Sequence, residues 1–500
     1  MRLLDNGRFY RFDTRTRRFE AHDALLIGVD GKIRSLDAPD AADAERVDMQ
    51  GAAVLPAFAD CHVHLTDVGY FLGTRDLSAA RTYEQFCDAV ARIPEEDGFV
   101  FAGQYDESLW HDRREADARP LERFHPAARA MLVRIDGHSA LVNRATLEWL
   151  ALSASTPGIE RGADGMPTGR LSLTANWQAQ RRFQGEMPVR QRREADRRAV
   201  ALALSRGALH LHAQLYGFPR EQYQAEIEAL RSLPAKIFPK VCEPDPRLAQ
   251  ELGLPFIGGD VFLDGSLGSR TAAQSEPYLD GDGCGSLRFD DRAVEAFFAQ
   301  AESMGIAAGV HAIGDAAIDQ CLRVWERVLR GKPSRRGARH FIEHFECARP
   351  EHIAACARMG IALSMQPQFD AQWGGTGAMY EARLGTRRMR SMNALGSIVR
   401  SGALLCGGDD APVCPLDPLS GMQACLDHHE AAERLNAHEA LAAYTVNAAS
   451  LAYAERETGN LDPGLSADLV VLDGDPFEAG FSACRVLQTW RNGQVAYSAL

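Results

Sequence analysis

The chain has 500 residues and a net charge of −13, from 55 Lys and Arg against 68 Asp and Glu, which argues against a nucleic-acid or anionic-membrane surface. With 46% hydrophobic and 25% charged residues, it is not a disordered chain or a coiled coil. No apolar run approaches the ~18 residues of a membrane helix, and the N-terminal segment lacks the apolar stretch of a signal peptide. Eleven cysteines without a CxxC pair indicate reduced thiols, so we expect a cytoplasmic protein.

The two ends of the chain share a pattern of short apolar segments separated by turn signals. Asp30-Gly31 near the N-terminus and Asn492-Gly493 near the C-terminus each separate two apolar runs, which predicts a β-hairpin at both places. We therefore expect residues 1–52 and 460–500 to build one small β-sandwich domain from both termini.

Between the ends, residues 53–459 alternate short apolar runs with helical patterns, which is typical of an α/β fold with parallel strands. Eight runs qualify as strands, the number that a (β/α)8 TIM-like barrel requires. The segment from about 66 to 200 is too long for one loop, so we interpret it as an insertion after strand one, with strands near 98–103 and 130–135. The eight predicted strands are 53–59, 207–213, 235–242, 260–264, 306–311, 338–344, 360–366 and 403–409.

The first strand ends in Asp60-Cys61-His62-Val63-His64. Side chains at i and i+2 of a strand point the same way, so His62 and His64 would project together from its carboxyl end. Two adjacent imidazoles suit a borderline divalent ion such as Zn²⁺. Taken alone, this pattern fits core or surface histidines equally well.

Three further predicted strands end in residues of the same kind. His311 ends one strand, Glu343-His344 ends the next, and Asp409-Asp410 ends the last. The carboxyl ends of barrel strands share one face, where sites are built. Four strand ends with metal-ligand residue types therefore predict a metal site at that face.

These residues resemble the pattern of the amidohydrolase superfamily. The local motifs are similar to its amidohydrolase-3 branch, which includes N-substituted formamide deformylases, and the resemblance covers essentially the whole chain. The motifs that carry it are Asp264–Ala272, His311–Asp315, Ile342–His344, Ser364–Pro367, Asp410–Val413, Gly103–Trp110, Asp136–Ala140, Pro167–Gly169, and Gly459–Gly464 with Ala467–Leu469.

The resemblance implies a role for each matching residue. His62 and His64 would hold one metal, His311 and His344 the second position, and Asp410 would bind metal and shuttle protons. Asp410 is preferred to Asp409 because Ala411-Pro412-Val413 fixes the register. His138 would donate a hydrogen bond to the developing oxyanion, with a structural loop histidine as the alternative. The implied cofactor is one or two divalent ions, Zn²⁺ first.

One departure from the branch concerns the metal site. The branch usually has a lysine four residues before the Asp-Gly-Ser turn, where it can be carboxylated to bridge two metals, and this chain has Asp260. Aspartate is an oxygen ligand but is much shorter. A dinuclear site bridged by Asp260, a mononuclear site and a damaged site all stay open, and Lys236 or Lys240 on the preceding strand could substitute.

Several other residues have two interpretations each. Tyr105 and Trp110 would line the pocket or pack in the insertion, and Arg383 would meet a substrate carboxylate or form a surface ion pair. Glu343 would support a ligand or form a simple salt bridge. The second HxH, His210 and His212, is interpreted as pocket-lining or structural. His428-His429 lies in a helical pattern, where adjacent residues face apart, so joint chelation is not expected.

The predicted function is a metal-dependent hydrolase that cleaves a non-peptide C–N bond, in an amide or an N-formyl or N-acyl amine, through an activated water. The alternatives are a mononuclear deaminase of a ring amidine and a catalytically inactive barrel used for binding. The expected partner is a small-molecule substrate, with no nucleic acid and no membrane. A homodimer is allowed, although no segment locates an interface.

Overall fold

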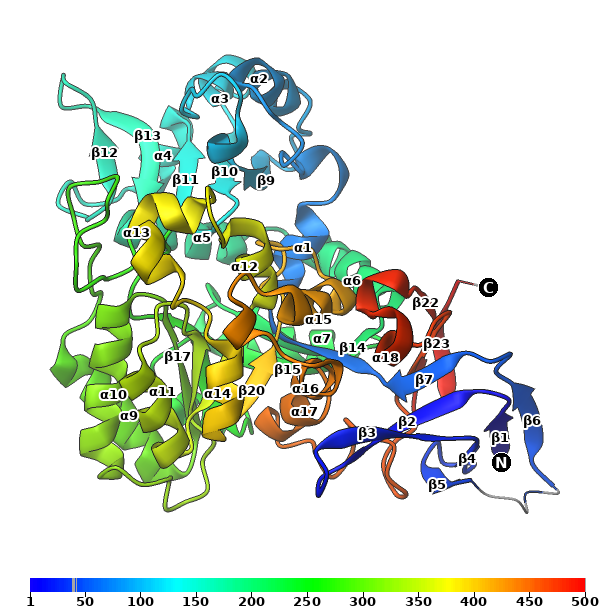
Figure 1. Ribbon diagram of the computed structural model, residues 1–500. Helices are drawn as coiled ribbons and strands as arrows, with labels where there is room; N and C mark the ends of the chain where they lie inside the picture. The colour runs from blue at the N-terminus through cyan, green and yellow to red at the C-terminus, as the bar shows by residue number, and fades with distance from the viewer. Residues whose placement is uncertain (38–40, 42, 500) are drawn as a thin grey trace.

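The computed structural model describes residues 1–37, 41 and 43–499, and it has a mixed α/β fold. Figure 1 shows three regions: strands from both termini on one side, a long helix-flanked strand region on the other, and the inserted segment above it. Among the described residues, no helix has the length and apolar character needed to cross a membrane.

The terminal region joins the two ends of the chain through its β-strands. A six-stranded sheet has the order β23-β22-β21-β7-β2-β3, in which β21 pairs antiparallel with β7, and a second sheet has the order β5-β4-β1-β6. Both predicted hairpin turns are present, between β4 and β5 and between β22 and β23. The elements are β1 (Arg2–Asp5), β2 (Arg8–Asp13), β3 (Arg18–His22), β4 (Leu25–Ile27), β5 (Ile33–Leu36), β6 (Glu45–Asp48), β7 (Ala53–Pro56), β21 (Leu469–Leu472), α18 (Pro476–Ala479), η5 (Phe481–Ala483), β22 (Val486–Arg491) and β23 (Gln494–Ser498).

The long middle region contains a strand in each of the eight predicted segments. All neighbouring strands are parallel, in sheets of order β15-β14-β8 and β16-β17-β18-β19-β20. The strands are β8 (Phe58–Val63), β14 (Ala208–Leu215), β15 (Lys236–Val241), β16 (Phe256–Phe262), β17 (Ala307–Ala312), β18 (Phe341–His344), β19 (Ala362–Met365) and β20 (Leu405–Gly407).

The edges of these two sheets lie next to each other. Strand β15 contacts β16, and β20 contacts β8. Beyond β20, the Asp410 N–H donates to the carbonyl of His62 over 2.8 Å, and the His64 N–H donates to that of Ala411 over 2.8 Å. Strand β8 runs on to Val63, past the predicted end at residue 59. His62 therefore lies inside the strand, and its backbone bond holds Asp410 beside it.

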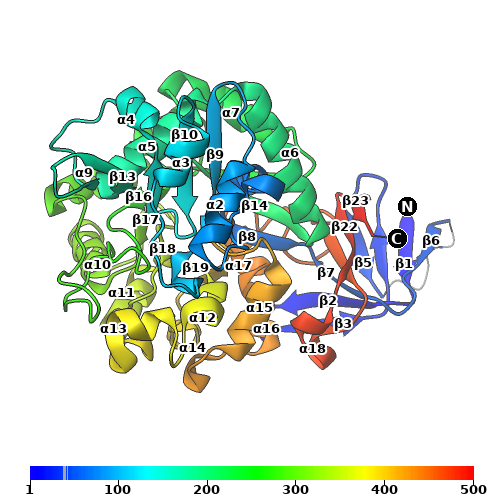
Figure 2. The ribbon, with the colours of Figure 1, turned by 90° about the horizontal axis from the view of Figure 1, so that it is seen from above.

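Helices flank the strands of the middle region, as Figure 2 shows from above. Their buried faces form one large core with the strands, which includes Trp325 stacked on Phe298. The helices are α6 (Val189–Ser205), η3 (Arg220–Gln222), α7 (Tyr223–Arg231), α8 (Pro246–Glu251), α9 (Asp291–Met304), α10 (Asp315–Leu329), α11 (Pro350–Met359), α12 (Pro367–Trp373), α13 (Met379–Met389), α14 (Leu395–Ser401), α15 (Pro418–Asp427), η4 (Ala431–Glu433), α16 (Ala437–Ala443) and α17 (Val446–Leu451).

The insertion contains its own mixed sheet, of order β12-β13-β11-β10-β9. Its strands β9 and β10 are parallel and lie where the sequence predicted strands near 98–103 and 130–135. Helix α5 follows β13 and borders the large cavity described below. The elements are α1 (Leu65–Tyr70), η1 (Gly73–Arg75), α2 (Tyr83–Ala91), β9 (Phe99–Tyr105), η2 (Glu107–Leu109), α3 (Arg119–Phe124), β10 (Arg129–Arg134), β11 (Ser139–Val142), α4 (Arg144–Leu150), β12 (Ile159–Arg161), β13 (Pro167–Ser172) and α5 (Leu173–Glu186).

Two glycines in β16 let its backbone lie close to the neighbouring strand β17 and to the side chain of Gln214 on β14. Gly258 has φ +91°, and a Cβ there would lie 2.1 Å from the carbonyl oxygen of Gly309. Gly259 has φ +110°, and a Cβ there would lie 2.3 Å from Oε1 of Gln214. Only glycine adopts this conformation without strain. The pair therefore sets where Asp260, the next residue, enters the site.

We predict that Gly258→Ala lowers the free energy of unfolding by about 2–4 kcal/mol, because it adds positive-φ strain and a backbone clash. The matched control is Gly253→Ala, at φ +63° with nothing within 4 Å of the added Cβ, for which about 1 kcal/mol is expected. Urea unfolding followed by tryptophan fluorescence measures both variants. Equal losses in the two would contradict the importance of the close approach.

Candidate active site

Four side chains from three strand ends converge at the carboxyl edge of the parallel strands. Nε2 of His62 lies 3.3 Å from an oxygen of Asp260 and 3.3 Å from Oδ1 of Asp410. Nε2 of His64 lies 3.1 Å from each of the same two carboxylates. The HxH pair therefore faces two carboxylates that come from β16 and from the segment after β20.

Asp260 lies between two sets of imidazoles. Its Oδ2 faces His62 and His64, whereas its Oδ1 lies 3.7 Å from Nε2 of His344. The buried aspartate thus presents one oxygen to each set. Asp410 is held in the left-handed region at φ +52°, and so is His344 at φ +72°, a strained backbone that is common at functional sites.

His311 and His138 extend the cluster along the cavity. The ring of His311 lies 4.5 Å from that of His344 and 5.2 Å from that of His138, centroid to centroid. Burial, with the neighbouring imidazoles, lowers the pKa of His311 to about 3 and that of His138 to about 4. Both rings are therefore neutral near pH 7, the state in which histidine can bind a metal or donate one hydrogen bond.

The opposite holds for His64. Burial alone would lower its pKa, but Asp260 and Asp410 outweigh burial and raise the pKa to about 10. The two carboxylates therefore attract positive charge to this point, whether it is a proton or a metal cation.

A buried ion pair supports the cluster from below. Nδ1 of His62 lies 2.9 Å from Glu343, and the ammonium of Lys240 donates to the same carboxylate over 2.5 Å. Lys240 also donates to the carbonyl of Cys61 over 2.7 Å. The carboxylate fixes the ring of His62 so that Nε2 faces the site. Glu343 thus fulfils both of its interpretations, because it supports His62 and forms a salt bridge. Lys240 points to Glu343 and not into the ligand cluster.

The two aspartates after β20 face in different directions. Asp410 faces His62 and His64, whereas the Asp409 carboxylate accepts a hydrogen bond from the Asp417 N–H over 2.7 Å at the start of α15. The Asp409 N–H donates to the buried Asp60 carboxylate over 3.0 Å. Asp409 therefore anchors the loop that presents Asp410.

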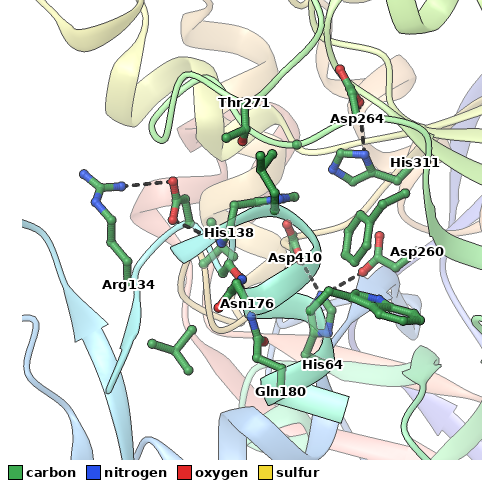
Figure 3. A pocket seen from close by; sticks show the side chains of 18 of the residues that line it. His64, Arg134, His138, Asn176, Gln180, Asp260, Asp264, Thr271, His311 and Asp410 are labelled. Carbon is green, nitrogen blue, oxygen red and sulfur yellow. Dashed lines mark hydrogen bonds and ion pairs between the residues drawn. The ribbon is translucent and has the colours of Figure 1, made fainter. Parts of the chain in front are cut away.

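A cavity of about 450 Å³ opens beside the cluster. It is bordered by the strand ends on one side and by the insertion on the other. Figure 3 shows His64, Asp260, His311 and Asp410 from the strand ends together with Asn176 and Gln180 from α5. The insertion supplies Arg134, Asp136, His138, Asn176, Trp177 and Gln180, and the loop after β16 supplies Asp264, Thr271, Ser286 and Arg288.

Three residues that the sequence assigned to substrate binding do not line this cavity. Tyr105 and Trp110 are buried against Phe86 in a separate hydrophobic core of the insertion, so their packing accounts for them. Arg383 pairs with Asp280 and donates to the carbonyl of Gly268 over 3.1 Å. Of the two interpretations of Arg383, the structure shows the ion pair, with Asp280.

In the second HxH pair, His210 has a structural role. His210 lies 3.3 Å from Asp468 and 2.9 Å from the hydroxyl of Thr458. His212 is buried, and neither ring nitrogen has a hydrogen-bond partner among the described residues. No group of potential ligands around either histidine was found in the described part of the chain.

The expectation for His428-His429 is wrong in its geometry. Helix α15 ends at Asp427, so the two residues leave the helix and their rings stack at 4.7 Å instead of facing apart. Both approach one oxygen of Asp370, at 3.4 Å for His428 and 2.5 Å for His429. The three side chains form a group separate from the cavity cluster.

The cavity cluster fits a divalent cation. His62 with His64 and Asp260, and His62 with His344 and Asp410, each offer ligand atoms within 4.8 Å of one another. Nε2 of His62 and Oδ1 of both aspartates are buried without a hydrogen-bond partner among the described residues. These nitrogen and oxygen atoms carry lone pairs and point at one another. A shared cation would bind all of them.

The comparisons with known proteins identify the family of the chain. The model of the amidohydrolase family matches residues 45–497. The chain belongs to the amidohydrolase family, in its amidohydrolase-3 branch, as the motifs predicted. The family makes the protein a hydrolase, and the ligand cluster at its cavity fits a divalent metal ion.

Similar proteins cover nearly the whole chain. A Bacillus subtilis (strain 168) protein named as an amidohydrolase, YtcJ, is 29% identical over 97% of this chain and 96% of its own length. The N-substituted formamide deformylase of Arthrobacter pascens is 24% identical over 94% of this chain and 93% of its own length. The crystal structure of an uncharacterized metal-dependent hydrolase from Pyrococcus horikoshii OT3 shares the fold, with a TM-score of 0.76, 24% identity and coverage of 96% of this chain and 99% of that one.

We predict that Asp260→Asn lowers the divalent metal content of the purified protein, because it removes the charge shared by both imidazole sets. We expect the variant to bind the metal ~10-fold more weakly and to lose at least one ion per chain. Elemental analysis after dialysis against a weak chelator measures this loss. Asp136→Asn is the matched control: it lines the same cavity but pairs with Arg134. Unchanged metal in Asp260→Asn would contradict its assignment as a ligand.

Proposed function

We propose that this hydrolase cleaves a non-peptide C–N bond of a small molecule, in an amide or an N-formyl or N-acyl amine. The observation that carries the proposal is the position of Asp410, whose carboxylate borders the cavity beside two imidazoles, with His138 also on the wall. A base and a hydrogen-bond donor on one cavity fit the addition of water to a carbonyl and the departure of an amine.

We propose two adjacent metal positions that share Asp260. His62, His64 and Asp410 would hold one ion, and His344 with His311 would hold the other, with one Asp260 oxygen toward each. Zinc is the metal we propose, because it combines imidazole nitrogen with carboxylate oxygen ligands. When bound, the metal supplies a water of lowered pKa and polarises the scissile carbonyl.

The protein's own groups carry the proton. Asp410 would take the proton of the attacking water and pass it to the leaving nitrogen, so that the amine departs neutral. His138 would donate a hydrogen bond to the carbonyl oxygen as negative charge develops on it. Its depressed pKa keeps the ring neutral. The Asp136–Arg134 pair holds the loop that carries it, since the backbone N–H of His138 donates to the Asp136 carboxylate over 3.2 Å.

The proposed scaffold is a closed (β/α)8 barrel with a terminal β-sandwich. Two contacts support closure, β15 with β16 and β20 with β8, together with the backbone bonds between His62, His64 and the segment after β20. Closure would place all eight carboxyl ends around one opening, which is where enzymes of this architecture bind substrate.

A second reaction follows from the replacement of the branch lysine by Asp260. If the shorter side chain serves only one metal, a mononuclear site that removes ammonia from a ring amidine is the alternative.

The name of the Arthrobacter pascens relative makes N-formyl amines the first class to assay.

We predict that Asp410→Asn lowers kcat on an N-formyl or N-acyl amine by about 10²- to 10⁴-fold, because it removes the proton carrier. The assay follows amine and formate or acid release, with ammonia measured in parallel on ring amidines. Asp427→Asn on α15 is the control and keeps wild-type rates. Retained activity in Asp410→Asn would contradict the proton role, and ammonia release alone would replace the amide assignment with the deaminase.

A further inference from the structure

We propose that the substrate carries a carboxylate that binds the guanidinium of Arg288 on the cavity wall. This inference rests on the proposed C–N hydrolysis and narrows its substrate class. It starts from the charges that line the cavity.

Two arginines border the cavity, and only one is neutralised by the protein. Arg134 lies 3.0 Å from Asp106, 3.1 Å from Glu107 and 3.1 Å from Asp136. Among the residues that the structure describes, no carboxylate lies within 4.0 Å of the Arg288 guanidinium. Within the same residues, the guanidinium has no hydrogen-bond acceptor. The cavity wall thus holds one cation without a counter-ion.

Arg288 is fixed in place rather than free in solvent. Its guanidinium lies 4.1 Å from the ring of Trp177. Its backbone N–H donates to the carbonyl of Leu263 over 2.8 Å, which fixes the base of the side chain. Arg181 lies 4.4 Å from the same ring but is paired with Glu243. Burial, with Arg181 nearby, lowers the pKa of Arg288 to about 10, so the group stays charged at neutral pH while poorly solvated.

A partly desolvated cation without a partner is costly, and a bound anion removes that cost. A planar guanidinium on an aromatic ring suits a carboxylate, which it can bind through two parallel hydrogen bonds. The ring of Trp177 keeps the fork oriented. Arg288 therefore has the properties of a carboxylate-binding group.

The acidic groups of the cavity do not oppose this placement, because each is already engaged. Asp67 accepts hydrogen bonds from Tyr216 and Gln184, and Asp136 pairs with Arg134. Asp264 accepts from the backbone N–H groups of residues 273, 313 and 314. Asp260 and Asp410 face the imidazole cluster.

The spacing from the cluster suits a small substrate. Leu263, whose carbonyl accepts the Arg288 backbone N–H, directly follows β16, the strand that carries Asp260. Arg288, Asp260 and Asp410 all line the same cavity of about 450 Å³. An N-acyl or N-formyl amino acid places its carboxylate a few bonds from the scissile C–N bond, within reach of a long side chain.

The test measures binding apart from turnover. In the Asp410→Asn background, calorimetry compares N-formyl-phenylalanine with its carboxamide, which has the same shape without the charge. We expect the carboxylate to bind about 10- to 100-fold more tightly, and Arg288→Ala to abolish that preference. Arg288→Lys should keep a smaller preference. Arg181→Ala, which changes the other arginine on Trp177, should leave it intact.

Equal binding of the two probes, no binding of either, or an unchanged preference in Arg288→Ala would overturn the inference. Hydrolysis by the otherwise unaltered protein is measured in parallel and reports on the proposed function. A carboxylate preference without hydrolysis of any amide or formamide supports the Arg288 site and counts against the C–N reaction. Hydrolysis of both probes at equal kcat/KM supports the reaction and overturns the carboxylate site.

Discussion

Two buried carboxylates placed against the same imidazoles are the constraint on which the site depends. Asp260 and Asp410 both lie within 3.3 Å of Nε2 of His62. Two like charges so close in a poorly solvated place repel each other, and only added positive charge makes the arrangement favourable. The backbone is bent to create it, since Asp410 and His344 both have positive φ. Strain of about 1–3 kcal/mol per residue persists only where the surroundings enforce it.

The surroundings that enforce it are themselves charged and buried. Lys240 and Glu343 neutralise each other in the interior, and Glu343 turns His62 so that its second nitrogen faces the carboxylates. Removing either member would leave an uncompensated buried charge, which costs more than the pair contributes. The lysine on the third parallel strand is therefore part of the support beneath the ligands. Asp409 has the same kind of role from the other side, because it ties the segment after β20 to α15.

The sequence could predict the parallel strands and the residues at their ends, because both follow from short-range patterns. Alternating apolar runs locate the eight strands, and the i, i+2 rule places His62 and His64 together. The cavity wall opposite could not be found this way. Trp177 and Arg288 lie on a helix and a loop whose positions depend on how the insertion packs, and no local periodicity encodes that. The same limit explains Tyr105 and Trp110, whose aromatic rings fit a core and a pocket equally well until the packing is known.

The replacement of the branch lysine by Asp260 becomes intelligible when the backbone is considered with the side chain. A short aspartate reaches the imidazoles only if its strand comes close to them. Gly258 and Gly259 precede it: a Cβ on Gly258 would collide with the backbone of the neighbouring β17, and one on Gly259 with the side chain of Gln214 on β14. The Asp260 N–H also donates to Gln214 over 3.3 Å, which draws β16 toward β14. The short side chain of Asp260 is thus placed by its own strand, through the two glycines before it and the bond to Gln214. The consequence is a rigid ligand, since aspartate has fewer rotatable bonds than lysine and its position is set by the sheet itself.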